Sequence, residues 1–223
     1  MVVIGASSGI GLATARAFRD AGDSVHAAAR REINEPGIAG HTLDITDHHA
    51  VARFAAPFEC VDALIISAGT NLKERRLHEL TPAAWDRMMA TNLSGPFYAI
   101  HSFLPHLKAA RGTVVIISSV SGAYTDRSGP AYQSAKSGAI KLSHGAGFES
   151  NGEVRFTVIL PGVVDTDILD SRPEPPSREL RDQMLHADDI AAACVFAVDL
   201  PPRAFVAELT ILPTALQSIG KTL

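Results

Sequence analysis

The sequence predicts a doubly wound α/β fold in which a mostly parallel, seven-stranded sheet is flanked by helices. Short apolar runs rich in β-branched residues alternate along the chain with longer segments of helical periodicity, as expected when crossover helices join parallel strands. The chain has 223 residues, which suits one domain with a substantial core, and no repeat or linker interrupts it. We therefore expect a single domain over residues 1–223.

Each expected strand is a short, mainly apolar run. The expected strands cover residues 2–4, 25–29, 41–45, 62–67, 113–117, 155–160 and 208–212. Helices are expected over residues 9–21, 81–107 and 188–198, and another begins at Gly129-Pro130, because proline suits the first helical turn. Residues 167–187 contain three prolines and several charges, which predicts a mobile substrate loop.

Composition excludes several classes of function. Hydrophobic residues make up 46% of the chain and charged residues 20%, and the net charge of −4 gives no reason to expect nucleic acid or a membrane as partner. No apolar run approaches the length of about 18 residues that spans a bilayer, and Met1 leads directly into the first strand, so we expect a cytoplasmic protein. Cys60 and Cys194 lie apart among apolar residues, which predicts buried free thiols and no metal site.

Residues 113–136 bring groups suited to proton transfer to the end of a strand. Ser118 and Ser119 follow the strand, and Tyr132 and Lys136 share one face of the next helix, one turn apart. A free tyrosine has a pKa of about 10, and a nearby ammonium is expected to lower it. Such a phenol could exchange a proton with an alcohol or carbonyl oxygen that a serine holds. Without further motifs, an ordinary exposed Tyr–Lys pair would be the simpler interpretation.

A glycine-rich turn links the first strand to the first helix. Gly5, Gly9 and Gly11 would allow a tight turn and the close approach of backbone amides to a pyrophosphate at the helix N-terminus. A generic strand–helix turn is the alternative interpretation of the glycines alone.

These motifs together resemble the short-chain dehydrogenase/reductase family. In the family's order the chain has Gly5-Ala-Ser-Ser-Gly9-Ile-Gly11, Ser67-Ala-Gly69, Asn92, Ser119, Tyr132 to Lys136 and Pro161-Gly162. The resemblance spans nearly the whole chain and implies a Rossmann-type fold. Two departures are Ile4, where the family usually has Thr, and Ser67, where it usually has Asn; in this fold the two segments are expected to lie side by side.

The resemblance implies a set of four catalytic residues. Tyr132 would be the acid/base, Lys136 would lower its pKa and contact the ribose, and Ser119 would orient the substrate oxygen. Ser119 is preferred to Ser118 because Val-x-Gly follows it and it lies thirteen positions before Tyr132. Asn92 would perturb its helix and hold a water that leads to Lys136; the alternative is an asparagine paired only with the backbone.

The resemblance also implies a nicotinamide dinucleotide cofactor. Its expected contacts are Gly5, Ser7, Ser8, Gly9, Ile10, Gly11, Arg30, Arg31, Asp44, Ile45, Ser67, Ala68, Gly69, Tyr132, Lys136, Pro161, Gly162, Val164 and Thr166. Ala29 stands where an NAD-preferring relative would have an acidic residue, and the arginines that follow favour NADP over NAD, since guanidinium can pair with a 2′-phosphate. Alternatively, both arginines are surface charges beside Glu32 and Glu35, and Asp44 merely shares in a turn that Asp47 caps.

The expected activity is NADP(H)-dependent interconversion of a carbonyl compound and a secondary alcohol. The alternatives are an NAD-dependent alcohol dehydrogenase of the same family and a non-catalytic dinucleotide-sensing protein. The expected substrate pocket is formed by Ser121, Ala123, Tyr124, Gly162, Val163 and Ile168, which favours a modest, fairly apolar compound. From the family we also expect a homodimer or homotetramer built on the helices that carry Asn92 and Tyr132.

Overall fold

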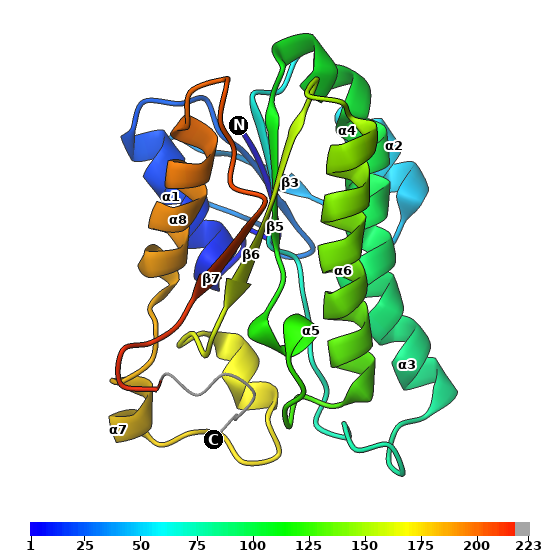
Figure 1. Ribbon diagram of the computed structural model, residues 1–223, viewed down its shortest axis with the longest axis vertical. Coiled ribbons are helices and arrows are strands. Elements are labelled where there is room, and N and C mark those ends of the chain that lie inside the picture. The colour runs from blue at the N-terminus through cyan, green and yellow to red at the C-terminus, as the bar shows by residue number, and fades with distance from the viewer. Residues whose placement is uncertain (217–223) are drawn as a thin grey trace.

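The computed structural model, which describes residues 1–216, contains one parallel sheet of seven strands in the order β3-β2-β1-β4-β5-β6-β7 (Figure 1). The strands are β1 (Val2–Ile4), β2 (His26–Ala29), β3 (Ala39–Thr42), β4 (Ala63–Ile66), β5 (Thr113–Ile117), β6 (Arg155–Pro161) and β7 (Glu208–Ile211). Every neighbouring pair is parallel. The prediction of a doubly wound α/β fold with seven strands is confirmed.

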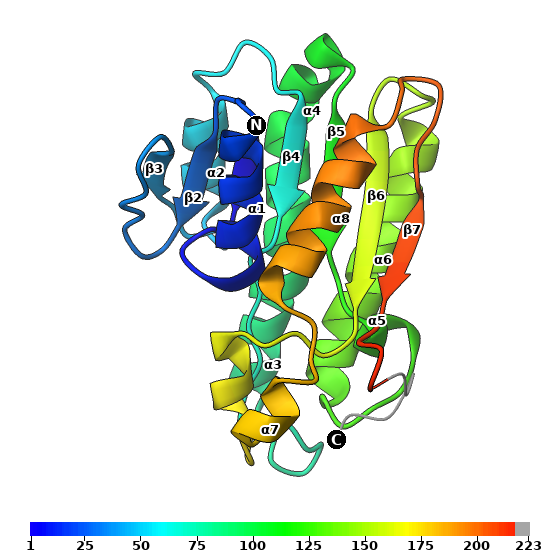
Figure 2. The same cartoon turned by 90° about the vertical axis from the view of Figure 1, so that its left-hand side faces the viewer.

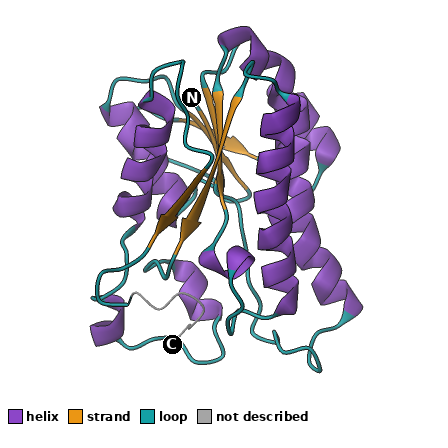
Figure 3. Cartoon of the chain, viewed as in Figure 1, coloured by secondary structure: helices purple, strands orange, loops and turns teal. Residues whose placement is uncertain are grey.

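Helices cover both faces of the sheet. One face carries α1 (Gly9–Asp20) and α8 (Ala187–Asp199), and the other carries α2 (His48–Ala55), α4 (Gly95–Ala110) and α6 (Pro130–Glu149). Figures 2 and 3 show the strands enclosed between these two layers. Within residues 1–216, no helix is long and apolar enough to cross a bilayer.

The central strands feed two separate cores because successive side chains of a strand point to opposite faces. In β5, Val114 and Ile116 pack into the core beneath α2, α4 and α6, whereas Val115 and Ile117 pack into the core beneath α1 and α8. All residues of β1, β4 and β5 are buried, as expected for parallel strands covered on both faces. These strands form the rigid platform for the loops at their carboxyl ends.

The sheet reverses its winding direction between β1 and β4. From β1 the chain passes through α1 to β2 on one side, and later through α2 to β4 on the other side. In such sheets, ligands bind at the carboxyl ends of the two strands that flank the reversal. The short elements α3 (Pro82–Met89), α5 (Val120–Ala123), α7 (Arg178–Arg181) and the 3-10 segment η2 (Asp167–Ser171) lie toward this end of the sheet (Figure 1).

Three expected elements differ from the structure. The third strand ends at Thr42 rather than residue 45, because the Asp44 carboxylate accepts hydrogen bonds from the amide and hydroxyl of Thr46, at 2.9 and 2.8 Å, and turns the chain. The helix expected over residues 81–107 is interrupted by a π-helical segment, η1 (Ala90–Ser94). The expected loop over residues 167–187 contains η2 and α7. Within it Arg181 forms ion pairs with Asp170 of the same loop and with Asp165, which precedes the loop.

The two cysteines differ in exposure. Cys194 is fully buried on α8, and burial raises the pKa of its thiol to about 12. Cys60 is exposed, so the prediction of a buried thiol is wrong there: it lies in the turn between α2 and β4, where the chain returns to the surface.

Candidate active site

A cavity of about 920 Å³ opens at the carboxyl ends of the central strands. Its volume lies near the upper end of the range of roughly 300–1,000 Å³ for ligand pockets. The expected cofactor contacts, with the single exception of Gly11, line this cavity, as do Ser119, Tyr132 and Lys136. The structure thus brings together residues that lie more than a hundred positions apart in the sequence.

The glycine-rich turn has the close approaches expected of a dinucleotide cradle. Gly5 has a φ of +92°, and a Cβ there would lie 2.3 Å from the amide nitrogen of Ala68. A Cβ on Gly11 would lie 2.3 Å from the carbonyl oxygen of Gly5, which explains why Gly11 is packed behind the turn rather than on the cavity wall. The turn therefore presents bare backbone at the start of α1, a surface that fits a pyrophosphate.

The two departures from the family pattern lie side by side, as predicted. The carbonyl oxygen of Ile4 accepts hydrogen bonds from the amides of Ser67, at 2.8 Å, and Ala68, at 3.1 Å. These are backbone contacts, so neither side chain is needed to hold β1 against the loop after β4.

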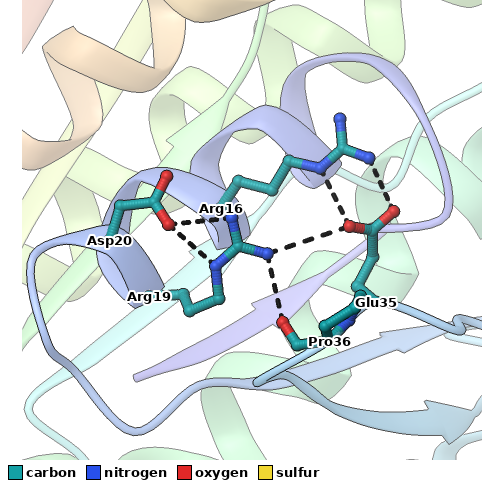
Figure 4. A network of polar contacts seen from close by, with 5 residues as sticks. All are labelled: Arg16, Arg19, Asp20, Glu35 and Pro36. Atoms are coloured by element: carbon teal, nitrogen blue, oxygen red, sulfur yellow. Dashed lines mark hydrogen bonds and ion pairs between the residues drawn. The ribbon is translucent and has the colours of Figure 1, made fainter.

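Of the two consecutive arginines, Arg31 faces the glycine-rich turn. Its Nη2 donates to the hydroxyl of Ser8 at 2.9 Å and to that of Ser7 at 3.2 Å. Glu35 does not neutralise it, because the Glu35 carboxylate accepts hydrogen bonds from Arg16 at 2.6 and 3.0 Å and also lies 3.9 Å from Arg19 (Figure 4). Arg31 therefore presents a positive charge beside two hydroxyls at the end of the cavity formed by the glycine-rich turn.

The two aspartates of the turn after β3 have different roles: Asp47 caps a helix, and Asp44 shapes the turn and lines the cavity. Asp47 caps α2 by accepting a hydrogen bond from Ala50 at 3.0 Å, and hydrogen bonds from backbone amides lower its pKa. Asp44 shapes the turn through Thr46 and still lines the cavity together with Ile45. Its contact with an adenine stays a prediction.

The two serines after β5 have different environments. The Ser118 hydroxyl is buried and donates to the carbonyl oxygen of Lys136 at 2.8 Å, which joins β5 to α6. Ser119 instead lines the cavity, and its hydroxyl caps α5 and interacts with the phenol of Tyr132. This arrangement agrees with the choice of Ser119 as the serine that faces a substrate.

Tyr132 and Lys136 lie on the cavity-facing side of α6. The Lys136 side chain is buried, lies 5.7 Å from the centre of the Tyr132 ring, and donates to the carbonyl oxygen of Ile117 at 2.8 Å. Burial lowers the pKa of Lys136 to about 8 and raises the pKa of Tyr132 to about 12, while Ser119 acts on the phenol in the opposite direction. The expected lowering of the tyrosine pKa is therefore not found in this structure, because burial outweighs the favourable interactions.

Asn92 is buried in the π-helical segment η1 and does not line the cavity. Its Nδ2 donates to the carbonyl oxygens of Met88 and Thr70, both at 3.1 Å, and its Oδ1 accepts a hydrogen bond from the amide of Thr70 at 3.1 Å. The predicted distortion of the helix is thus present, and π segments often mark functional sites. A link from Asn92 to Lys136 through water stays a prediction.

Comparison with known proteins identifies the family. The family model described as short chain dehydrogenase matches residues 1–176, which is well over half of the chain. The chain belongs to the short-chain dehydrogenase family.

Several of its relatives are named as dehydrogenases. A cis-4-hydroxycyclohexanecarboxylate dehydrogenase of Sinomonas cyclohexanicum is 32% identical over 218 residues, covering 87% of each chain. A serine 3-dehydrogenase of Agrobacterium fabrum is 29% identical, covering 96% of this chain and 93% of its own. Among solved structures, an alcohol dehydrogenase of the archaeon Thermococcus sibiricus complexed with 5-hydroxy-NADP aligns with a TM-score of 0.84 at 28% identity, covering 97% of both chains. The chain is an NAD(P)-dependent oxidoreductase that acts on CH–OH groups.

The pocket expected for the substrate of this short-chain dehydrogenase differs in part from the structure. Ser121, Gly162, Val163 and Ile168 line the cavity, but Ala123 and Tyr124 do not, because α5 turns them outward and leaves both exposed. Three arginines that the sequence did not single out, Arg75, Arg87 and Arg172, line the cavity instead. Arg75 lies in a run of charged residues and Arg172 beside several prolines, so both resemble ordinary surface residues in the sequence.

Proposed function

We propose that this dehydrogenase interconverts a carbonyl compound and a secondary alcohol with NADP(H), and that Tyr132 is the acid/base. The observation that carries the proposal is the position of the Tyr132 phenol, beside the Ser119 hydroxyl on the cavity wall and with Lys136 behind its ring. A bound nicotinamide would supply the hydride. The protein supplies orientation, proton transfer and exclusion of water.

In the reductive direction, Tyr132 would donate its proton to the carbonyl oxygen while Ser119 holds that oxygen by a hydrogen bond. A phenol with a pKa of about 12 is neutral near pH 7, which is the form that can donate a proton. Lys136, with a pKa of about 8, is mostly a cation at that pH and favours the phenolate that remains. Asn92 would complete the route by which Lys136 returns a proton to Tyr132.

The preference for NADP rests on Arg31. Its guanidinium lies beside the hydroxyls of Ser7 and Ser8, which is a suitable donor set for a 2′-phosphate. The relative from Thermococcus sibiricus was determined with 5-hydroxy-NADP, which agrees with this assignment. The glycine-rich turn would hold the pyrophosphate, Asp44 and Ile45 the adenine, and Pro161, Gly162, Val164 and Thr166 the nicotinamide end.

The first experiment is a parallel titration with NADPH and NADH, followed by melting temperature. A selective shift with NADPH is expected, whereas an NADH preference would favour the NAD-dependent alternative. The second experiment is Tyr132→Phe, which removes the proton donor but keeps the ring. Because a positioned acid/base contributes about 10²- to 10⁴-fold, kcat should fall within that range while NADPH binding persists.

Tyr124→Phe is the matched control, because Tyr124 is 46% exposed and lies outside the cavity. It should retain wild-type turnover. If Tyr132→Phe also retained wild-type turnover, Tyr132 would not be the acid/base and the proposed mechanism would be wrong.

We also propose a homodimer or homotetramer built on α4 and α6. Phe97 on α4 and Phe148 on α6 are 48% and 89% exposed, so each presents an apolar ring that a second copy could cover.

A further inference from the structure

We infer that the substrate carries a carboxylate, and that Arg75 and Arg172 bind this group while its carbonyl or alcohol carbon lies at Tyr132. The inference deepens the proposed function and rests on it for the position of the reacting carbon. It concerns the part of the cavity that Arg75 and Arg172 line, and neither arginine is among the predicted cofactor contacts.

The two arginines reach this end from separate segments of the chain. Arg75 lies between β4 and α3, and its backbone is pressed against Gly129, where a Cβ would lie 2.4 Å from the Arg75 carbonyl oxygen. Gly129 directly precedes α6, the helix that carries Tyr132. Arg172 follows η2, and Arg75 joins the two segments because its Nη2 donates to the Ser171 carbonyl oxygen at 3.1 Å.

Most of the hydrogen-bonding capacity of both guanidinium groups is unused. Arg75 makes that one side-chain hydrogen bond, and its Nε is buried without a partner among the described residues. Arg172 makes no side-chain hydrogen bond or ion pair with any residue in the described part of the chain. Both are partly buried, and an unpaired guanidinium in such a position costs stability. A structural role explains the single contact of Arg75, but it does not explain Arg172.

The carboxylates around the two arginines do not form ion pairs with them. Arg181 already pairs with Asp165 and Asp170. Asp126 acts on both arginines through its charge, but it is held by the Ser121 hydroxyl, by the amide of Ser128 at 2.7 Å and by Gln133 at 3.4 Å. Asp167 also lines the cavity. No carboxylate within residues 1–216 lies within 4 Å of Arg75 or Arg172. Burial lowers the pKa of both arginines, and the charge of Arg172 lowers that of Arg75 further.

A carboxylate satisfies this arrangement better than a neutral group. Guanidinium pairs with carboxylate through two parallel hydrogen bonds. An anion also offsets the charge of the two arginines, which a neutral group cannot do. The same side of the cavity is lined by Ser121, Val163 and Ile168, which suit a short aliphatic chain between the two polar ends.

The test compares oxo acids with their amides, which have nearly the same shape but no charge. Acetoacetate and acetoacetamide, and levulinate and levulinamide, would be assayed with NADPH on the wild type, Arg172→Gln and Arg75→Gln. For at least one pair the wild type should prefer the acid in kcat/KM. Arg172→Gln should lower that preference about 10- to 100-fold, mainly through KM, as expected for the loss of a hydrogen bond to a charged group.

Arg178→Gln is the matched control, because Arg178 lies six positions further along the same segment, is exposed and does not line the cavity. It should keep the wild-type preference for the acid. Arg172→Lys, which retains the charge, should keep part of it. An acid-to-amide ratio near one in the wild type, or a ratio unchanged in both Arg172→Gln and Arg75→Gln, would overturn the inference.

Calorimetric titration of the protein–NADP complex with the same acids and amides separates this inference from the proposed function. Acid binding that depends on Arg172 without any turnover would support the carboxylate site and count against the proposed reaction. Turnover of the amides and acids alike would support the reaction and overturn the carboxylate site.

Discussion

The two ends of the cavity are built in different ways. At the end proposed for the adenosine, the contacts come from the glycine-rich turn and from strand ends that are adjacent in the sheet, and bare backbone forms much of the wall. At the end proposed for the substrate, Arg75 and Arg172 extend long side chains from segments that lie almost a hundred positions apart. The proposed adenosine end is therefore determined by backbone geometry, and the proposed substrate end by side chains.

This difference matches what each end is proposed to bind. Backbone amides at a helix N-terminus suit a pyrophosphate, so a side chain added to a glycine of the turn would disturb that end. The proposed substrate end can change its selectivity through one or two side chains without altering the sheet. Lys136 and Tyr132 lie where the two ends meet and belong to both.

Gly5→Ala should have the largest effect on stability, because it tests the backbone-determined end. The substitution places a Cβ 2.3 Å from the Ala68 amide at a φ of +92°. Strain at positive φ costs about 1–3 kcal/mol and overpacking about 1–3 kcal/mol. We expect a loss of about 2–6 kcal/mol in the free energy of unfolding, measured by urea titration, together with loss of cofactor binding.

Gly22→Ala separates the two causes, because Gly22 has a φ of +96° but nothing within 4 Å of an added Cβ. It should lose only the strain contribution. Equal losses of unfolding free energy in the two variants would show that the clash between the added Cβ and Ala68 costs no stability.

Arg31→Ala should have a smaller effect, confined to cofactor choice, because it removes the guanidinium that contacts the hydroxyls of Ser7 and Ser8 at the backbone-determined end. Loss of a hydrogen bond to a charged group costs about 1.5–3 kcal/mol, so the Kd for NADPH should rise about 10- to 100-fold, with little change for NADH. Arg30→Ala should have the lesser effect of the two, because only Arg31 contacts Ser7 and Ser8. A larger loss in Arg30→Ala would show that Arg30, and not Arg31, binds the 2′-phosphate.

The same comparison explains which features the sequence predicts. The turn at Gly5, the alternation of strands and helices and the choice of Ser119 depend on short-range patterns, and each can be recognised from residue spacing. Arg75 and Arg172 meet only because η2 folds back over the loop after β4, a contact between distant segments. No local pattern marks such a pair.

The electrostatics of the centre could not be predicted from spacing either. The separation of four residues correctly places Lys136 next to Tyr132, but it contains no information about how much protein surrounds them. The two pKa values depend mainly on that burial, which results from the packing of α5 and the loops around α6.

The smallest expected effect is the pH dependence of stability caused by Lys136, and it tests the point where the two ends meet. Burial lowers the pKa of this lysine from 10.5 to about 8. Between these values the unfolded chain binds more protons than the folded chain. The free energy of unfolding should therefore rise as the pH increases from about 8 towards 10.5, and it should decrease when the pH is lowered over the same range. Between pH 8 and 9.5 the wild type should gain about 1.5 kcal/mol from this group. Lys136→Met should lack this gain, and subtracting the two urea-unfolding profiles removes the contribution of Cys194, which lies on α8 at the other face of the sheet. Parallel profiles would mean that Lys136 is solvated in the folded protein, and its role as a buried cation behind Tyr132 would then be wrong.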